Sequence, residues 1–192
     1  LRGIHSFAHY ENGIIELDDT GFHQGTDGSV TARLRYDTAT RAISGQMQIE
    51  RMDVQALLAL ANQKEDRLTG QITSAVRLGG TLDNPAISLT GEIAEGALAS
   101  YPISDVVLDV ALADRVLTIR KLSGTQGDGS FSAAGTMDFD GPADVDVTAT
   151  DIALGIFTRF GGVEEAVTGT TSLTLHIGGY TQQPEADLKI TA

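Results

Sequence analysis

Residues 68–89 read LTGQITSAVRLGGTLDNPAISL. Ile72, Val76 and Leu78 stand an even number of residues apart, and most of the residues between them are polar. Because successive side chains of a β-strand point to opposite faces, this spacing predicts a strand with one apolar and one polar face. The run Asp83-Asn84-Pro85 favours a chain reversal. The stretch therefore predicts a half-buried strand, a turn and a second strand.

The same alternation recurs along the chain, and residues suited to chain reversal separate the alternating segments. Strands with one polar face belong in antiparallel sheets, because parallel strands are covered on both faces. Aromatic residues make up only 5% of the chain, which suits short strands with small aliphatic side chains. We therefore predict an all-β fold built on an elongated antiparallel sheet. The other alternating segments are 30–36, 43–50, 106–112, 145–149 and 173–177, and further turns fall at 25–28, 127–129 and 140–142.

An internal repeat relates the two halves of the chain at an offset of 99 residues. The match needs no gap from about residue 49 to residue 93. Residues 25–34 resemble 124–135, where the best offset is 101 because a turn differs in length by two residues. We therefore expect two repeats of ~99 residues, at 1–100 and 101–192. Matched positions are Thr69-Gly70 with Thr168-Gly169, Gly79-Gly80 with Gly178-Gly179, and Pro85 with Pro184.

One short amphipathic helix is expected in each repeat, near 53–61 and near 152–160. In each segment four apolar residues stand at i, i+3, i+4 and i+7, which places them on one helix face. Asp53 suits the N-cap of the first helix, and Asn62 and Gly161 suit the two helix ends. The apolar positions are Val54, Leu57, Leu58 and Ala61 in the first helix and Ala153, Ile156, Phe157 and Phe160 in the second.

The charge balance argues against several classes of partner. The chain has 192 residues, with 13 Lys and Arg against 26 Asp and Glu, and a formal net charge of -13. Nucleic acids and anionic lipid surfaces attract cationic proteins, so we expect no nucleic-acid partner and no docking through basic patches. Cysteine is absent, which removes disulfides and thiol chemistry. The most apolar stretch, 54–61, is far shorter than a membrane-spanning helix.

The sequence contains no recognised catalytic motif, so we expect no enzyme activity, no cofactor and no metal. It has no G-x-S-x-G, P-loop or H-E-x-x-H pattern. His5 and His9 could share one face of a strand, but no third metal ligand is near them in the sequence. The acidic residues around Gly141-Pro142 lack the spacing of a calcium loop and are interpreted as a solvated turn. These are Asp138, Asp140, Asp144 and Asp146.

The order of elements in each half resembles a known family. Residues 68–87 give Thr-Gly, an alternating strand, Gly-Gly-Thr-Leu-Asp-Asn-Pro and a further strand, and residues 167–186 repeat this order with Tyr180 in place of the Thr. The run from Gly79 to Pro85 resembles the recurrent G-T-x-x-x-P signature of TamB-type proteins, the translocation and assembly module group within the AsmA-like superfamily. This resemblance covers nearly the whole chain but rests on turns and periodicity.

The resemblance implies a sheet folded into a taco-like trough with an apolar concave face. It implies a periplasmic location, a parent protein anchored in the inner membrane, and roles in phospholipid transport and outer-membrane biogenesis. It further implies phospholipid, neighbouring repeats of the same chain and a BamA-like outer-membrane barrel as partners. Since the chain starts at Leu1, we expect it to be a fragment of such a protein.

Three functions are left open by the sequence. The first is a segment of a bridge whose apolar sheet face conducts or shields acyl chains. The second is a non-enzymatic scaffold that assists outer-membrane protein assembly by β-augmentation. The third is a repeat-built adhesin or carbohydrate-binding solenoid, for which clustered aromatics or metal loops are missing. The apolar face can be an open groove or a closed core. The candidate lipid-facing residues are Val30, Ala32, Leu34, Ile72, Val76, Leu78, Ile87, Leu89, Leu173, Leu175, Ile177 and Leu188.

Overall fold

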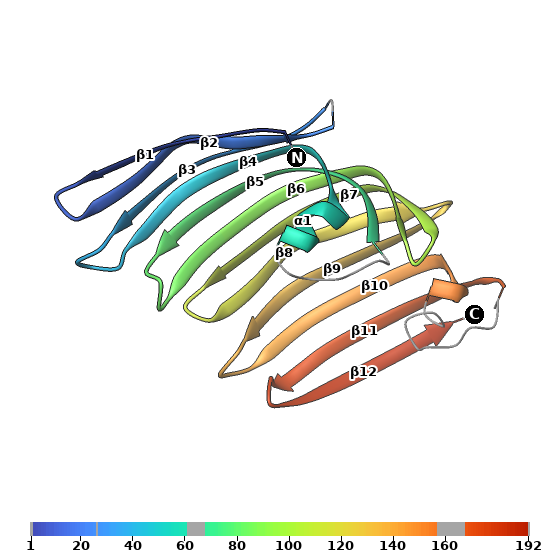
Figure 1. The fold of residues 1–192 in the computed structure, drawn as a ribbon. Coiled ribbons are helices and arrows are strands. Elements are labelled where there is room, and N and C mark those ends of the chain that lie inside the picture. Colours follow the sequence, from blue (N-terminus) through green and yellow to red (C-terminus); the bar gives the residue numbers. More distant parts are fainter. Residues whose placement is uncertain (1, 26, 61–67, 157–167, 192) are drawn as a thin grey trace.

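The computed structural model describes residues 2–25, 27–60, 68–156 and 168–191. These residues form one open antiparallel sheet in which the order of the strands follows their order in the chain (Figure 1). The prediction of an all-β antiparallel fold is therefore confirmed. The strands are β1 (Arg2–Glu11), β2 (Ile14–Gln24), β3 (Gly28–Asp37), β4 (Ile43–Asp53), β5 (Leu68–Gly80), β6 (Pro85–Leu98), β7 (Tyr101–Ala113), β8 (Val116–Gln126), β9 (Gly129–Asp138), β10 (Ala143–Ala153), β11 (Thr170–Tyr180) and β12 (Gln183–Thr191).

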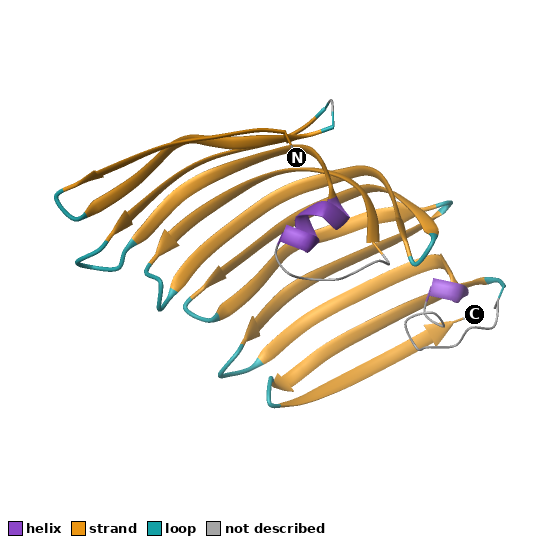
Figure 2. Ribbon diagram, viewed as in Figure 1, coloured by secondary structure: helices purple, strands orange, loops and turns teal. Residues whose placement is uncertain are grey.

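Helical segments lie against one face of the sheet (Figure 2). The helix α1 (Val54–Leu60) follows β4 and packs against β4 and β5. The Asp53 carboxylate accepts hydrogen bonds from the backbone N–H groups of Gln55 (2.8 Å) and Ala56 (3.3 Å), so the predicted N-cap is confirmed. None of the described helices is long and apolar enough to cross a membrane.

The second helical segment begins later than predicted. Residues 154–156 are helical, whereas Ala153, predicted to lie on the helix face, is the last residue of β10. Ile156, which lies on the predicted apolar helix face, is buried. The predicted helical residues Phe157 and Phe160, together with Ala61, Asn62 and Gly161, lie outside the described residues.

The predicted chain reversals all fall between strands. Gly80, with a φ of 79°, ends β5, and the turn that follows is closed by a hydrogen bond from the Thr81 N–H to the Asn84 carbonyl (3.1 Å). Glycine suits this position because a left-handed backbone is strained for residues with a Cβ. Turns likewise separate β2 from β3, β8 from β9 and β9 from β10. The predicted boundary between the two repeats, at residue 100, falls in the turn between β6 and β7. These two strands pair with each other from Ile87 to Leu98 of β6 within the same sheet.

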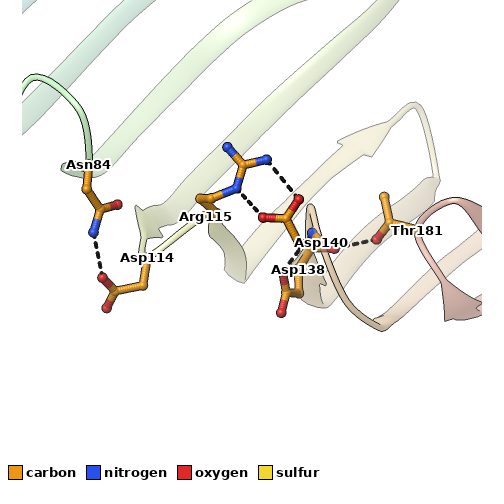
Figure 3. Close-up of polar contacts among 6 residues, drawn as sticks. All are labelled: Asn84, Asp114, Arg115, Asp138, Asp140 and Thr181. Carbon is orange, nitrogen blue, oxygen red and sulfur yellow. Dashed lines mark hydrogen bonds and ion pairs between the residues drawn. The ribbon is translucent and has the colours of Figure 1, made fainter.

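The hairpin turns at one end of the sheet contact each other from turn to turn, and we call this set of contacts the turn row. Neighbouring turns meet at five junctions. At four of them the later turn donates a backbone N–H to a backbone carbonyl of the preceding turn. These hydrogen bonds run from Thr38 to Gly13 (2.9 Å), from Leu82 to Arg41 (3.1 Å), from Phe139 to Arg115 (3.0 Å) and from Thr181 to Gly141 (2.9 Å). At the fifth junction the Asn84 amide donates to the Asp114 carboxylate at 2.8 Å (Figure 3). The ladder of backbone hydrogen bonds therefore extends beyond the strand ends.

Ion pairs reinforce the turn row. The Arg115 guanidinium donates to both carboxylate oxygens of Asp140, and the Thr181 hydroxyl donates to the Asp138 carbonyl (Figure 3). The hydrogen bond from Arg115 lowers the pKa of the Asp140 carboxyl. Asp138 and Asp140 thus lie at a hydrogen-bonded turn. The prediction that Asp144 and Asp146 belong to the same turn is wrong, because both residues lie in β10.

The junction between strand and helix is built the same way in both halves. Arg51 and Asp151 have positive φ angles of 45° and 53° and sit at β-bulges in β4 and β10. Their N–H groups donate to hydroxyls of the next strand, Arg51 to Thr73 and Asp151 to Ser172. Two residues on, the N–H groups of Asp53 and Ala153 donate to the side-chain carbonyls of Gln24 and Gln126. The junctions therefore share one hydrogen-bond scheme.

These shared features correct the sequence alignment. The bulges at Arg51 and Asp151 lie 100 residues apart, whereas Gly80 and Gly179, with φ angles of 79° and 78°, lie 99 apart. The sequence alignment at a constant offset of 99 residues is therefore wrong by one residue for the segments that precede β5 and β11. The offset is 100 for the equivalent residues Asp53 and Ala153 and 99 for Thr73 and Ser172, so it changes between these positions, which hydrophobic spacing alone does not align. The division of the chain into two domains, one for each repeat, stays a prediction.

The most buried apolar residues lie where the helical segments meet the sheet. Met52, next to the β4 bulge, has a fully buried side chain, and it clusters with Val30 and Ile49. A second cluster joins Val54 of α1 to Ile93. The third cluster, Ala149, Ile152 and Ile156, lies at the equivalent junction of β10. The strand–helix junctions therefore contain most of the closed core.

Replacing Met52 by alanine should destabilise the protein by about 2–5 kcal/mol, because it removes fully buried apolar atoms and leaves a cavity. Leu82, whose side chain is 51% exposed in a turn, provides the control, and Leu82→Ala should change stability by less than about 0.5 kcal/mol. Urea unfolding followed by circular dichroism measures both. Equal losses in the two variants would contradict the assignment of the core.

Candidate functional site

The strand register places apolar residues in continuous rows on one face of the sheet. Residues directly paired across antiparallel strands share a face, so each row can be followed from strand to strand. A first row is Ala32, Met47, Val76, Leu89, Val110, Ile119, Gly135, Val145, Ile177 and Ala186. A second is Leu17, Leu34, Gly45, Leu78, Ile87, Leu112, Leu117, Met137 and Ala143. We call this surface the apolar face.

All twelve candidate residues lie on the apolar face. A third row, interrupted by the buried Ser74 and by Gly91, is Val30, Ile49, Ser74, Gly91, Leu108, Leu122, Ala133, Val147, Leu175 and Leu188. Ile72 and Leu173 lie on the same face two positions from Ser74 and Leu175 along their strands. The structure therefore brings residues from β3, β5, β6, β11 and β12 onto one surface.

The opposite face is polar. One row across it is Arg33, Gln46, Arg77, Ser88, Ala111, Thr118, Thr136 and Asp144. Arg35 on this face pairs with Glu16 at 3.0 Å, and Arg120 pairs with Asp109 at 2.8 Å. The sheet is therefore amphipathic as a whole, with charges and hydroxyls exposed on one side and alkyl side chains on the other.

The described helical segments cover only one end of the apolar face. Residues near α1, such as Val30, Ile49 and Ile93, are buried. Toward the turn row, Leu78 and Leu112 are only half-buried. An apolar hollow of about 310 Å³ opens at that end. Its lining residues are Ile15, Leu17, Leu34, Arg35, Tyr36, Ile43, Ser44, Leu78 and Leu82. The face is therefore closed at the helical end and accessible at the other.

Alkyl contact is the chemistry that such a face supports. Its rows offer methyl and methylene groups to whatever lies against it, and the charged groups of the sheet lie on the other side. Each methylene of a ligand that it removes from water contributes about 0.8 kcal/mol. The hollow is lined almost entirely by apolar atoms.

The polar face holds one group of potential metal ligands among the described residues. This group consists of Asp144, Asp146 and His176, each of which has one potential ligand atom within 4.8 Å of those of the other two. The sequence did not connect these residues, because the pairing of β10 with β11 joins positions 30 residues apart. His176 Nδ1 is 2.9 Å from Asp146, and this hydrogen bond, followed by the nearby negative charges, raises the pKa of His176. The arrangement is that of a surface ion pair.

The two histidines considered as a metal pair are not brought to one site. His5 lies 3.9 Å from Asp19, whereas His9 lies 3.4 Å from Glu11. Each is therefore engaged with a separate carboxylate along β1 and the neighbouring β2.

Comparisons of the chain with protein-family models, with curated proteins and with solved structures give no match. The resemblance to TamB-type proteins therefore stays a prediction.

The pKa of His176 should exceed its ordinary value of 6.5, and Asp146→Asn should lower it, because the variant removes the strongest stabilising partner of the imidazolium. Because the folded-state pKa is raised, the pair contributes stability below the unfolded-state pKa and loses it as pH rises through the folded-state pKa. Proton NMR titration of the imidazole measures the shift. Asp128→Asn, in the turn between β8 and β9, is the control, and an equal effect there would contradict the assignment.

Proposed function

We propose that this chain is a non-enzymatic segment of a periplasmic, TamB/AsmA-like protein whose apolar face shields phospholipid acyl chains. The observation that carries the proposal is the apolar face itself, which runs from β2 to β12 and is covered by the described helical segments at one end only. Soluble proteins rarely leave a large contiguous apolar surface without a binding role.

The composition of the apolar face favours flexible alkyl chains over rigid ligands. Leucine, isoleucine, valine and alanine dominate its rows, and aromatic residues are scarce in the whole chain. Such a surface offers dispersion contacts without directional partners. A chain of about ten methylenes laid along it gains roughly 8 kcal/mol from burial before ordering costs are subtracted. The uniform surface thus suits acyl chains of varied length.

The polar face supports the same proposal. A conduit that works in water needs one soluble side, and the polar face supplies it with charged and hydroxyl side chains. The net charge of -13 further disfavours collapse onto anionic lipid surfaces. The trough shape, the inner-membrane anchor of the parent protein and a BamA-like partner belong to this proposal and derive from the family resemblance.

A second candidate uses the edges of a sheet. The edge strands of the described sheet are β1 and β12, and a scaffold of this kind would add a client strand to an edge that is free in the whole protein. This scaffold function uses the edges, whereas acyl-chain shielding uses the apolar face. Substitutions on the face therefore separate the two candidates.

The test of acyl-chain shielding is binding of a fluorescent long-chain fatty acid, followed by native mass spectrometry with a palmitoyl-oleoyl phospholipid. Val76→Asp should weaken binding by at least about tenfold, because it places a carboxylate among alkyl contacts. Ala75→Asp, one residue away on the polar face, should leave binding within about twofold. Leu175→Asp and Thr174→Asp provide a second matched pair on β11.

Circular dichroism establishes that each variant is folded before binding is compared. If wild type binds neither probe, acyl-chain shielding is wrong and the scaffold is favoured. If Ala75→Asp and Val76→Asp lose binding equally, the ligand does not lie on the apolar face.

A further inference from the structure

Two aspartates and a histidine converge on the polar face in the second half of the sheet. Asp144 and Asp146 stand two residues apart on β10, so their side chains share this face. Asp146 pairs directly with His176 of β11. The Nδ1 atom of His176 is 2.9 Å from a carboxylate oxygen of Asp146 and 3.9 Å from one of Asp144. The three side chains therefore bring two oxygens and one nitrogen within 4.8 Å of one another.

This group differs from the other contacts that histidines make in the described part of the chain. His5 and His9 each lie beside one carboxylate. Asp144 and Asp146, by contrast, share the imidazole of His176, which is their only cationic partner among the described residues. The imidazole distinguishes the group from a cluster of surface carboxylates, because it adds a nitrogen ligand to the two oxygen ligands.

The fold does not require this combination of side chains. In the first half of the sheet, β4 and β5 pair as β10 and β11 do, with Gln46 opposite Arg77. The offset is 100 residues for β4 and β10 and 99 for β5 and β11. Ser44 and Gln46 are therefore equivalent to the two aspartates, and Arg77 is equivalent to the histidine. A guanidinium offers no lone pair to a metal, so the ligand set belongs to the second half alone.

We propose that Asp144, Asp146 and His176 bind a divalent transition-metal ion, with zinc as the ion that best fits their donor set. Zinc accepts imidazole nitrogen and carboxylate oxygen ligands, whereas calcium and magnesium bind oxygen ligands. Zinc bonds of ~2.0–2.1 Å arranged in a tetrahedron separate the ligand atoms by ~3.3 Å. The distances from His176 Nδ1 to the two carboxylates, 2.9 and 3.9 Å, lie on either side of this value. Side-chain shifts of about half an ångström complete the geometry.

Binding exchanges a proton for the metal. In the metal-free protein a hydrogen bond joins His176 Nδ1 to Asp146. The zinc ion takes the lone pair of Nδ1, so a proton on this atom is released, and the charge of the ion offsets the two carboxylates. Three protein ligands leave the fourth position to water. The ion joins β10 to β11 on the polar face, so the proposal does not rest on acyl-chain binding at the apolar face.

Titration with zinc chloride, followed by isothermal calorimetry and by proton NMR of the imidazoles, tests the site. Wild type should bind one equivalent with a dissociation constant below about 50 µM. The imidazole signals of His176 should shift, whereas those of His5, His9 and His23 should not. Calcium chloride in roughly hundredfold excess should not displace the zinc, because imidazole nitrogen is a poor ligand for calcium.

Two variants transfer side chains of the first half of the sheet into the site. His176→Arg and Asp146→Gln suit the strand pairing, because Arg77 and Gln46 occupy the equivalent positions. Each should weaken zinc binding at least about tenfold, since each removes one of three ligands. His9→Gln, which removes a histidine beside a single carboxylate, is the control and should leave binding within about twofold. Far-ultraviolet circular dichroism checks that each variant keeps its β structure.

Three results would overturn the proposal. The first is zinc binding by wild type that is weaker than about 50 µM or that takes up several equivalents, as an adventitious surface site does. The second is displacement of zinc by calcium, which would mean that the carboxylates attract cations without the imidazole. The third is an equal loss of zinc binding in His9→Gln and His176→Arg.

Discussion

The structure depends on a strand register that keeps the alternating apolar side chains of every strand on the same face of the antiparallel sheet. A slip of one residue in any strand would move its apolar side chains to the polar face. The observed register keeps one row of residues on the apolar face from Ala32 in β3 to Ala186 in β12. Local hydrophobic patterns favour each register, and the turn row fixes it at one end. A contact such as Thr181 with Gly141 forms only when neighbouring hairpins have the correct offset.

The bulges allow β4 and β10 to lead into helical segments while their apolar side chains stay on the apolar face. An extra residue at Arg51 or Asp151 shifts the following residue, Met52 or Ile152, onto the buried side beside the helix. The positive φ costs free energy for a residue with a side chain. The Thr73 and Ser172 hydroxyl oxygens accept hydrogen bonds from the N–H groups that the bulge removes from the ladder. The shared scheme explains why both helical segments cover the same end of the sheet.

Much of the fold could be predicted from the sequence because its determinants are local. Alternation identified the strands, turn residues identified the reversals, and Asp53 marked the start of α1. The grouping of Asp144 and Asp146 with His176 could not be predicted, because it depends on the pairing of two strands. The one-residue change of offset was missed because the equivalence of Arg51 and Asp151 is visible only in the backbone geometry of their bulges, and neither residue has a distinctive side chain that would align them in the sequence.

The apolar face poses a physical problem that the described helical segments solve at one end only. A sheet with one apolar side must cover that side or bind something with it. Near α1 the side chains of Val30, Ile49 and Ile93 are buried, whereas Leu78 and Leu112, toward the turn row, are half-buried. The part of the face that the helical segments leave uncovered is continuous across the strands, because the register keeps the apolar residues in rows. An extended apolar ligand would cover such rows along their length, which is the arrangement that the proposed function requires.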